Sequence, residues 1–189
     1  MADKELNRLR VAILATDGVE QVELFKPREA LKEAGAETKV VSPKGGTIKG
    51  WNHTDWGGQI PVDVDLNNAD PKDFDALLLP GGVINPDRLR MEPKAVQFVR
   101  SFFEAEKPVA AICHGPWTII EADEASGRRL TSWPSLKTDL QNAGAEWVDE
   151  QMVRDGNLVT SRKPDDLPAF NRGMVELFQE ARSRTRQVA

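Results

Sequence analysis

Four short apolar runs, separated by longer stretches of helical periodicity, constrain the fold of this chain most. The runs lie at Val11–Ala15, Thr38–Val41, Ala76–Leu79 and Val109–Ile112. Runs of this length without regular polar alternation indicate strands that are buried on both faces. Because amphipathic stretches lie between them, we predict an α/β fold in which right-handed crossovers build a mainly parallel sheet with helices on both faces.

The helical stretches carry ordinary start and stop signals. Residues Gln21–Ala34 have helical periodicity and are followed by Gly35, the residue type that favours a helix C-terminus. Residues Pro93–Glu106 place Val99 and Phe102 on one face, and proline is favoured in a first turn. Both stretches are therefore predicted as helices that cover the sheet.

Two other regions break the regular order of strand and helix. In Gly45–Leu66, paired glycines and alternating apolar residues predict a small antiparallel excursion at a sheet edge. Near the end of the chain we expect short strands at Trp147–Asp149, Met152–Arg154 and Leu158–Thr160. A final helix is expected to begin near Asp166, its candidate cap, and to fray before the Arg-rich tail.

Composition limits the class of protein. The chain has 189 residues, 40% of them hydrophobic and 29% charged, which fits one soluble domain with a core over about residues 10–180 and charged, flexible termini. No apolar run is long enough to span a membrane, and the charged N-terminus does not resemble a signal peptide. The net charge of −5 argues against a specific nucleic-acid partner. The single cysteine, Cys113, forms no internal disulfide, which favours a cytoplasmic location.

Cys113 is the residue that most indicates chemistry. It lies in the run Val-Ala-Ala-Ile-Cys-His-Gly-Pro, between a predicted strand and a helix predicted at Pro116–Ala122. This order is that of a nucleophile elbow, and Ala111 and Gly115 supply its small flanking residues. Because a helix N-terminus favours the thiolate, we expect a thiol pKa below its ordinary value of about 8.5. The alternative is a small buried core residue, the usual place of a free cysteine.

A second predicted strand ends in the run Leu-Leu-Leu-Pro-Gly-Gly, at Gly81 and Gly82. The carboxyl ends of parallel strands share one edge, where ligands of open α/β sheets bind. Glycines at this edge let backbone N–H groups face a ligand, so the amides of Gly82 and His114 are candidates for an oxyanion hole. The alternative is an ordinary turn between a strand and a loop.

Three stretches together resemble the PfpI family of intracellular proteases and general stress proteins. They are Asp73–Gly82, Lys107–Pro116 and Val159–Pro168. That family is part of the class I glutamine amidotransferase-like superfamily, which also holds the Parkinson-disease protein deglycase. Over about residues 10–178 of this chain, the resemblance implies a single PfpI-type domain with a flavodoxin-like three-layer α/β/α sandwich and a reactive cysteine.

The resemblance implies that Glu23 holds the reactive cysteine. Glu20 and Glu23 lie three residues apart, about one helical turn, so both can face the same side, and Glu20 is a secondary candidate. A carboxyl next to a thiolate is expected to be protonated and to donate a hydrogen bond, because two adjacent anions repel. Without the resemblance, both residues fit ordinary acidic positions at a helix N-terminus.

The resemblance also implies a homo-oligomer, a dimer or a hexamer, with the site near a subunit interface. An acidic residue of the neighbouring subunit then orients His114, and in the loop Val83–Arg90 that residue is Asp87. The alternative is that Asp87 is a solvated loop residue. Trp117, next to the elbow, stands where the family commonly has glutamine or a small residue, which could narrow the pocket.

The chain contains only two histidines, His53 and His114. A glutaminase of the superfamily needs a histidine and a glutamate late in the chain to complete its Cys-His-Glu triad, so glutamine hydrolysis is not expected. His53 lies in no cluster of ligands with metal-binding spacing. We therefore predict an exposed hairpin histidine and no metal site.

Together with these residues, the resemblance implies a cysteine-dependent stress-response enzyme without a cofactor. The resemblance implies that its substrate is a small aldehyde, a glycated protein or a peptide, which Cys113 would attack while His114 moves protons. A small aldehyde suits a shallow pocket better than a polypeptide does, which favours glyoxalase or deglycase chemistry over proteolysis. The alternative is a non-enzymatic stress protein, either a chaperone or a redox sensor with an oxidisable Cys113.

Overall fold

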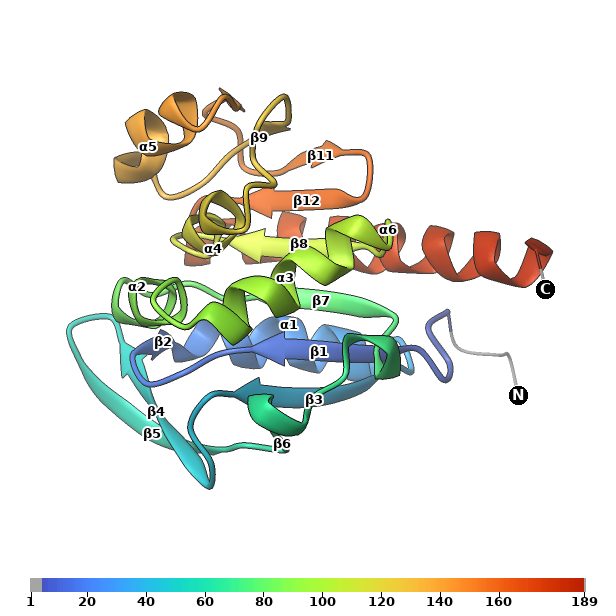
Figure 1. Cartoon of the computed structure of the whole chain (residues 1–189), viewed down its shortest axis with the longest axis horizontal. Coiled ribbons are helices and arrows are strands. Elements are labelled where there is room, and N and C mark those ends of the chain that lie inside the picture. Colours follow the sequence, from blue (N-terminus) through green and yellow to red (C-terminus); the bar gives the residue numbers. More distant parts are fainter. Residues whose placement is uncertain (1–4, 189) are drawn as a thin grey trace.

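The centre of the molecule is a seven-stranded sheet with the strand order β11-β12-β8-β7-β1-β3-β6 (Figure 1). The computed structural model describes residues 5–188. The strands of the sheet are β1 (Arg10–Leu14), β3 (Glu37–Ser42), β6 (Val64–Asp65), β7 (Ala76–Leu79), β8 (Val109–Ile112), β11 (Val153–Asp155) and β12 (Leu158–Ser161). All neighbouring strands are parallel except β11 and β12. The predicted mainly parallel sheet is therefore confirmed.

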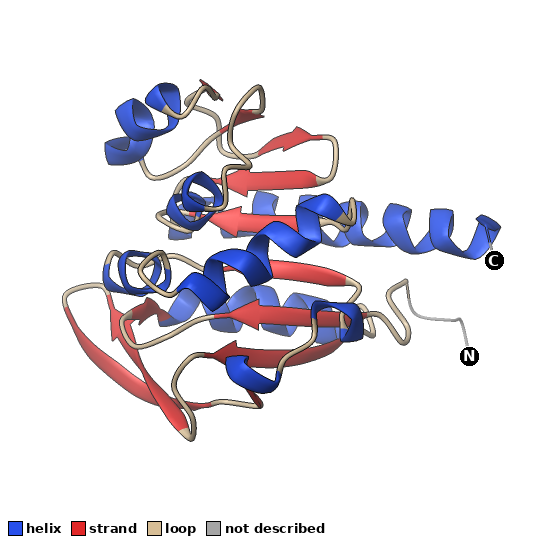
Figure 2. Cartoon of the chain, viewed as in Figure 1, coloured by secondary structure: helices blue, strands red, loops and turns tan. Residues whose placement is uncertain are grey.

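Helices cover both faces of this sheet (Figure 2). One face carries α1 (Gln21–Glu33) and α6 (Leu167–Val188), and the other carries α3 (Pro93–Glu104), α4 (Pro116–Glu121) and α5 (Lys137–Asn142). Alternate residues of β1 serve the two cores: Val11 and Ile13 pack with α1 and α6, whereas Ala12 and Leu14 pack with the opposite helices. The predicted three-layer α/β/α sandwich is confirmed.

Local signals set the ends of these helices. Helix α1 ends next to Gly35, whose φ of +100° lies in the left-handed region that glycine adopts without steric cost. The Gly35 N–H donates to the carbonyl of Lys32, 3.0 Å away, which satisfies one of the last helical carbonyls. Helix α3 begins at Pro93, as predicted, because a first turn needs no N–H from that position.

The region Gly45–Leu66 forms a hairpin that differs from the expectation in its place. Strands β4 (Thr47–Asn52) and β5 (Asp55–Pro61) are antiparallel, as predicted, but they join β2 (Val19–Glu20) in a separate three-stranded sheet (Figure 1). Only β6 returns to the edge of the main sheet, where it pairs in parallel with β3. Since β2 lies between β1 and α1, it holds the hairpin at the carboxyl ends of the central strands.

The C-terminal part brings three further differences. The strand expected around Trp147 is β10 (Glu146–Trp147), and it pairs with β9 (Arg129–Leu130), which the sequence did not predict. Asp166 does not act as the expected cap, because its carboxylate accepts bonds of 2.9–3.1 Å from the backbone and guanidinium of Arg162. Helix α6 continues to Val188, through the tail that was expected to fray.

Within residues 5–188, no helix is both long and apolar enough to cross a membrane.

Candidate active site

Cys113 follows β8 directly, at the carboxyl edge of the sheet, and α4 begins three residues later. Its φ of +62° lies in the left-handed region, which is unusual for a residue with a Cβ and marks a sharp turn. A Cβ on Gly115 would lie 2.6 Å from the Leu79 carbonyl and 3.0 Å from that of Ile112, so the helix could not pass this close with a larger residue. The strand, turn and helix thus have the geometry of a nucleophile elbow.

The Pro-Gly-Gly turn after β7 packs against the same cysteine. A Cβ on Gly81 would lie 2.7 Å from the Cβ of Cys113, and one on Gly82 would lie 2.7 Å from the backbone nitrogen of Glu20. Only glycine allows this approach of backbone to backbone. The amides of Gly82 and His114 both donate to the Cys113 sulfur, so the two candidate oxyanion donors lie together at the reactive atom.

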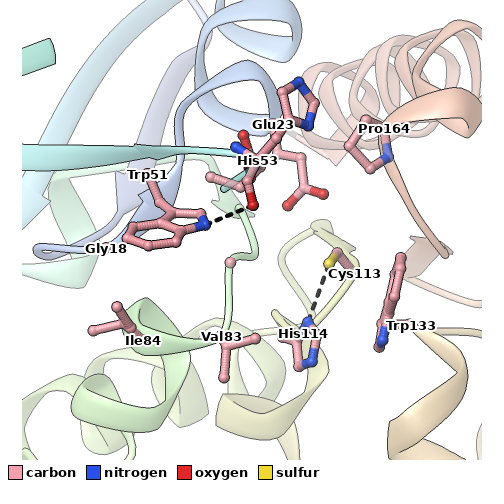
Figure 3. A pocket seen from close by; sticks show the side chains of 12 residues that line it. Gly18, Glu23, Trp51, His53, Val83, Ile84, Cys113, His114, Trp133 and Pro164 are labelled. Carbon is pink, nitrogen blue, oxygen red and sulfur yellow. Dashed lines mark hydrogen bonds between the residues drawn. The ribbon is translucent and has the colours of Figure 1, made fainter. Parts of the chain in front are cut away.

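Glu23, in the first turn of α1, is fully buried beside the cysteine. Its Oε2 accepts a hydrogen bond of 2.9 Å from the Gly81 N–H, and the carboxyl points toward Cys113 (Figure 3). Burial raises the pKa of this carboxyl to about 8. Glu23 is therefore protonated at neutral pH and can donate its proton toward the sulfur.

The Cys113 thiol is 6% exposed, and this burial raises its pKa; an ionised Glu23 raises it further. The expectation of a lowered thiol pKa is therefore wrong. Loss of hydration outweighs the dipole of α4, which has only six residues, and the two amides at the sulfur. A thiol of this kind needs a base next to it in order to react.

His114 can be that base. Its Nδ1 lies 3.2 Å from the Cys113 Sγ, and burial lowers the pKa of the imidazole to about 4, so the ring is neutral at pH 7. The tautomer that carries its proton on Nε2 leaves Nδ1 free to accept the thiol proton. Trp133 stacks on the ring with centroids 5.8 Å apart, and Trp117 meets it edge-on at 5.2 Å. The two indoles hold the imidazole in place.

Above these groups lies a cavity of about 320 Å³. Its lining combines the predicted residues and Trp133 with several residues that sequence reasoning missed: Gly18, Trp51, His53, Val83, Ile84 and Pro164. His53 is exposed in the turn of the hairpin, as predicted, yet it also lines the cavity (Figure 3). The cluster of aromatic residues in the hairpin was a signal, but nothing local showed that the hairpin folds over the elbow. Within residues 5–188 no three His, Cys, Asp or Glu side chains form a metal-binding group.

Glu20 lies in the same cavity wall and is 7% exposed. Its Oε2 accepts a hydrogen bond of 3.2 Å from the backbone N–H of His53. Burial raises the pKa of this carboxyl as well, and its charge contributes to the raised pKa of Glu23. The structure thus brings both candidate carboxyls to the site, in different surroundings.

Two predicted residues stand apart from the cavity. The segment Val83–Arg90, predicted as a loop, contains helix α2 (Ile84–Leu89), on which Asp87 is exposed and outside the cavity lining. Within a single chain, Asp87 is therefore not part of the cavity wall that contains His114. Trp117 does not line the cavity either. Its Nε1 donates a hydrogen bond of 2.9 Å to Asp139, and the indole held in this way contacts the imidazole of His114 edge-on.

The fold and the cysteine-centred cavity define a class of protein that comparison with known sequences identifies. The profile of the DJ-1/PfpI family matches residues 9–177, and the chain belongs to this family. A deglycase of Pyrococcus abyssi is 46% identical over 171 residues, 90% of this chain and 100% of the relative. General stress protein 18 of Bacillus subtilis is 43% identical over 173 residues, 90% of this chain and 98% of the relative.

Solved structures agree with this assignment. DJ-1beta of Drosophila melanogaster superposes with a TM-score of 0.81 at 28% identity, over 94% of this chain and 97% of that one. A two-domain protein of Anabaena variabilis, with a DJ-1/ThiJ/PfpI-like and a ferritin-like domain, gives a TM-score of 0.84 at 38% identity. That match covers 89% of this chain and 48% of the two-domain protein. The resemblance inferred from the three sequence stretches is confirmed.

Proposed function

We propose that this member of a family of stress-response enzymes is a cysteine-dependent enzyme that converts reactive carbonyl compounds, free or bound to protein side chains. The observation that carries the proposal is the contact of the Cys113 Sγ with Nδ1 of a neutral His114, 3.2 Å away. The protonated Glu23 faces the same sulfur. Relatives named deglycases support the choice of substrate class.

The first step follows from these positions. The thiol proton passes to Nδ1 of His114 while the sulfur attacks the aldehyde carbon, so a C–S bond forms as the carbonyl π bond breaks. The carbonyl oxygen receives the electron pair, and the amides of Gly82 and His114, together with the Glu23 proton, are placed to stabilise that charge. When the Glu23 proton passes to this oxygen, the product of the step is a hemithioacetal on Cys113.

For an α-oxoaldehyde such as methylglyoxal, the later steps need only water. A proton leaves the carbon that carries the sulfur and another adds to the neighbouring carbon, which turns the hemithioacetal into a thioester of a 2-hydroxy acid. Water then displaces the thiol and releases the acid. His114 and Glu23 are the groups that can carry these protons. The overall reaction converts one aldehyde and one water into one hydroxy acid.

The size of the cavity favours this substrate class over a polypeptide. A volume of about 320 Å³ accommodates a small aldehyde or one modified side chain. A protease would have to seat an extended chain on both sides of the scissile bond. We therefore place glyoxalase or deglycase chemistry before PfpI-type proteolysis.

We also propose that the protein acts as a homo-oligomer in the cytoplasm, where a lone thiol stays reduced. The family resemblance supports an arrangement, in a dimer or a hexamer, in which Asp87 of the partner subunit orients His114. The exposure of Asp87 on α2 leaves its carboxylate free to reach another chain.

The test compares the wild type with Cys113→Ala and Cys113→Ser. Purified protein is assayed for loss of methylglyoxal, release of amine from a methylglyoxal-treated peptide and hydrolysis of casein. We expect both carbonyl assays to respond and both variants to be inactive, with casein intact. If no carbonyl is consumed while low doses of peroxide convert Cys113 to sulfenic or sulfinic acid, the redox-sensor function replaces this proposal.

A further inference from the structure

Glu20 carries an unused hydrogen-bond acceptor in the wall of the cavity. It pairs in register with Trp51 across β2 and β4, and its side chain does not cap helix α1. While Oε2 accepts the His53 N–H, Oε1 is buried and has no hydrogen-bond partner among the residues that the structure describes. We call Glu20, Trp51 and His53 the hairpin wall. A buried acceptor without a donor is costly, and a ligand that supplies the donor removes this cost.

The charge of the cavity narrows the choice of ligand. Among the described residues that line it are two carboxyls, Glu20 and Glu23, but neither lysine nor arginine. A phosphate or carboxylate group would therefore find no cationic side chain in this part of the lining. An N–H group suits the free Oε1 atom, and Trp51, which pairs in register with Glu20 and also lines the cavity, has an indole of the kind that attracts cations.

We propose that the hairpin wall binds the nitrogen of a carbonyl adduct formed on a lysine or arginine side chain. The N–H of the adduct donates to Oε1 of Glu20 and lies against Trp51, while its carbonyl-derived carbon reaches Cys113. This inference rests on the proposed function of the site. Free methylglyoxal has no N–H, so it uses the cysteine end of the cavity alone, and Glu20 is a specificity residue for protein-bound adducts.

Protection of Cys113 from iodoacetamide tests the subsite without any turnover. The probes are the amides of N-acetylarginine, N-acetyllysine and N-acetylnorleucine, the last an uncharged control of similar length. We measure the concentration that halves the alkylation rate at pH 7. In the wild type, about tenfold less of an N–H cation than of the norleucine amide is expected to suffice, the effect of one hydrogen bond to a charged group. Comparison of the arginine probe with the lysine probe shows which of the two adducts fits the hairpin wall better.

The Glu20→Gln variant sharpens this test. Its amide oxygen can still accept the His53 N–H, but its NH₂ group then faces the ligand, so an acceptor becomes a donor. We expect the preference for the cationic probes to disappear. Asp55→Asn removes one carboxylate from the exposed hairpin tip, outside the cavity lining, and is expected to keep the preference. Glu20→Ala provides a second loss of the acceptor if the Gln variant fails to fold, as judged by its melting temperature.

Equal protection by all three probes in the wild type would overturn the proposal. So would a preference that survives in a folded Glu20 variant. Turnover adds a second measurement: the ratio of kcat/KM for an N-acetylarginine adduct to that for free methylglyoxal should fall about tenfold in Glu20→Gln, mainly through KM. A complete lack of carbonyl turnover would refute the proposed function, whereas the protection experiment would still decide the subsite.

Discussion

Glu20 and Glu23 are the same residue type, three positions apart, and both are buried in one cavity, yet their surroundings differ. Glu23 faces the Cys113 thiol, and its carboxyl keeps a proton because burial raises its pKa to about 8. Glu20 is tied to the hairpin by the His53 N–H and keeps one oxygen free. The comparison teaches that the role of each carboxyl is set by the groups packed around it and not by its spacing along the chain. These surroundings make Glu23 a proton donor at the reacting sulfur and Glu20 an acceptor for another part of the substrate.

The largest expected effect tests whether the catalytic end of the cavity, which contains Glu23, needs a residue from a second chain. Cys113→Ala and Asp87→Ala subunits, each folded and inactive alone, are mixed under conditions that allow subunit exchange. Some mixed sites then combine a wild-type Cys113 with the partner subunit's wild-type Asp87, so activity should return from zero. Methylglyoxal loss is the measurement. If exchange is proven and no activity appears, Asp87 acts within its own chain or has no role.

The next effect separates the two carboxyls at the chemical step. Glu23→Leu removes the proton donor beside Cys113 and should lower kcat for methylglyoxal about 100-fold, a typical contribution of general acid catalysis. Glu23→Gln retains an N–H donor at this position and should lose only about tenfold. Steady-state kinetics on folded variants gives both values. Equal losses in Leu and Gln would show that no proton from Glu23 is used.

The pH dependence of stability gives an intermediate effect. The pKa of Glu23 is raised from 4.5 to about 8, so between these values the folded state binds a proton that the unfolded state has lost. The contribution of Glu23 to the free energy of unfolding should therefore fall as pH rises from 4.5 to about 8, by a few kcal/mol in total. Glu23→Gln should remove most of this slope. Urea unfolding of both proteins at pH 5, 6.5, 8 and 9 measures it.

The titration of His114 has the opposite effect on the pH dependence of stability. Its pKa is lowered from 6.5 to about 4, so in this range the unfolded state binds the extra proton and stability falls as pH decreases. Between pH 4.5 and 6.5 the opposite slopes of Glu23 and His114 cancel, so the protein should be most stable in this range and lose stability from pH 6.5 to about 8. A stability curve of Glu23→Gln that still declines from pH 5 to pH 8 by as much as the wild type would contradict the assignment of the upper limit.

The smallest expected effect concerns the two indoles around His114. Trp133→Leu removes the stacked face and should lower kcat/KM about fivefold, within the range of one aromatic contact. Trp117→Phe keeps an aromatic edge and loses only the bond to Asp139, so its effect should be smaller. The activity of the two variants toward methylglyoxal is compared at one pH. The reverse order would show that Trp117, not Trp133, holds the imidazole.

Much of the fold was open to prediction because its signals are local. An apolar run such as Val109–Ile112 must be buried whatever surrounds it, and Gly35 ends α1 through its own backbone freedom. The elbow was visible for the same reason, since the strand, Cys113 and the small residues beside it are contiguous. The direction of the thiol pKa shift could not be predicted from the sequence, because it depends on how completely distant elements exclude water from the sulfur.

The sequence by itself determined the mainly parallel sheet, the elbow at Cys113 and the presence of two acidic residues one helical turn apart. Only the tertiary structure decided that Glu23 faces the sulfur while Glu20 faces the hairpin. It also decided that Trp51 and Trp133 help to enclose the cavity and that Asp87 lies outside it. The physical reason is range. Backbone preferences and periodicity act over a few residues, whereas burial, hydrogen bonding and pKa depend on segments such as the hairpin, which is distant in sequence and in contact only after folding.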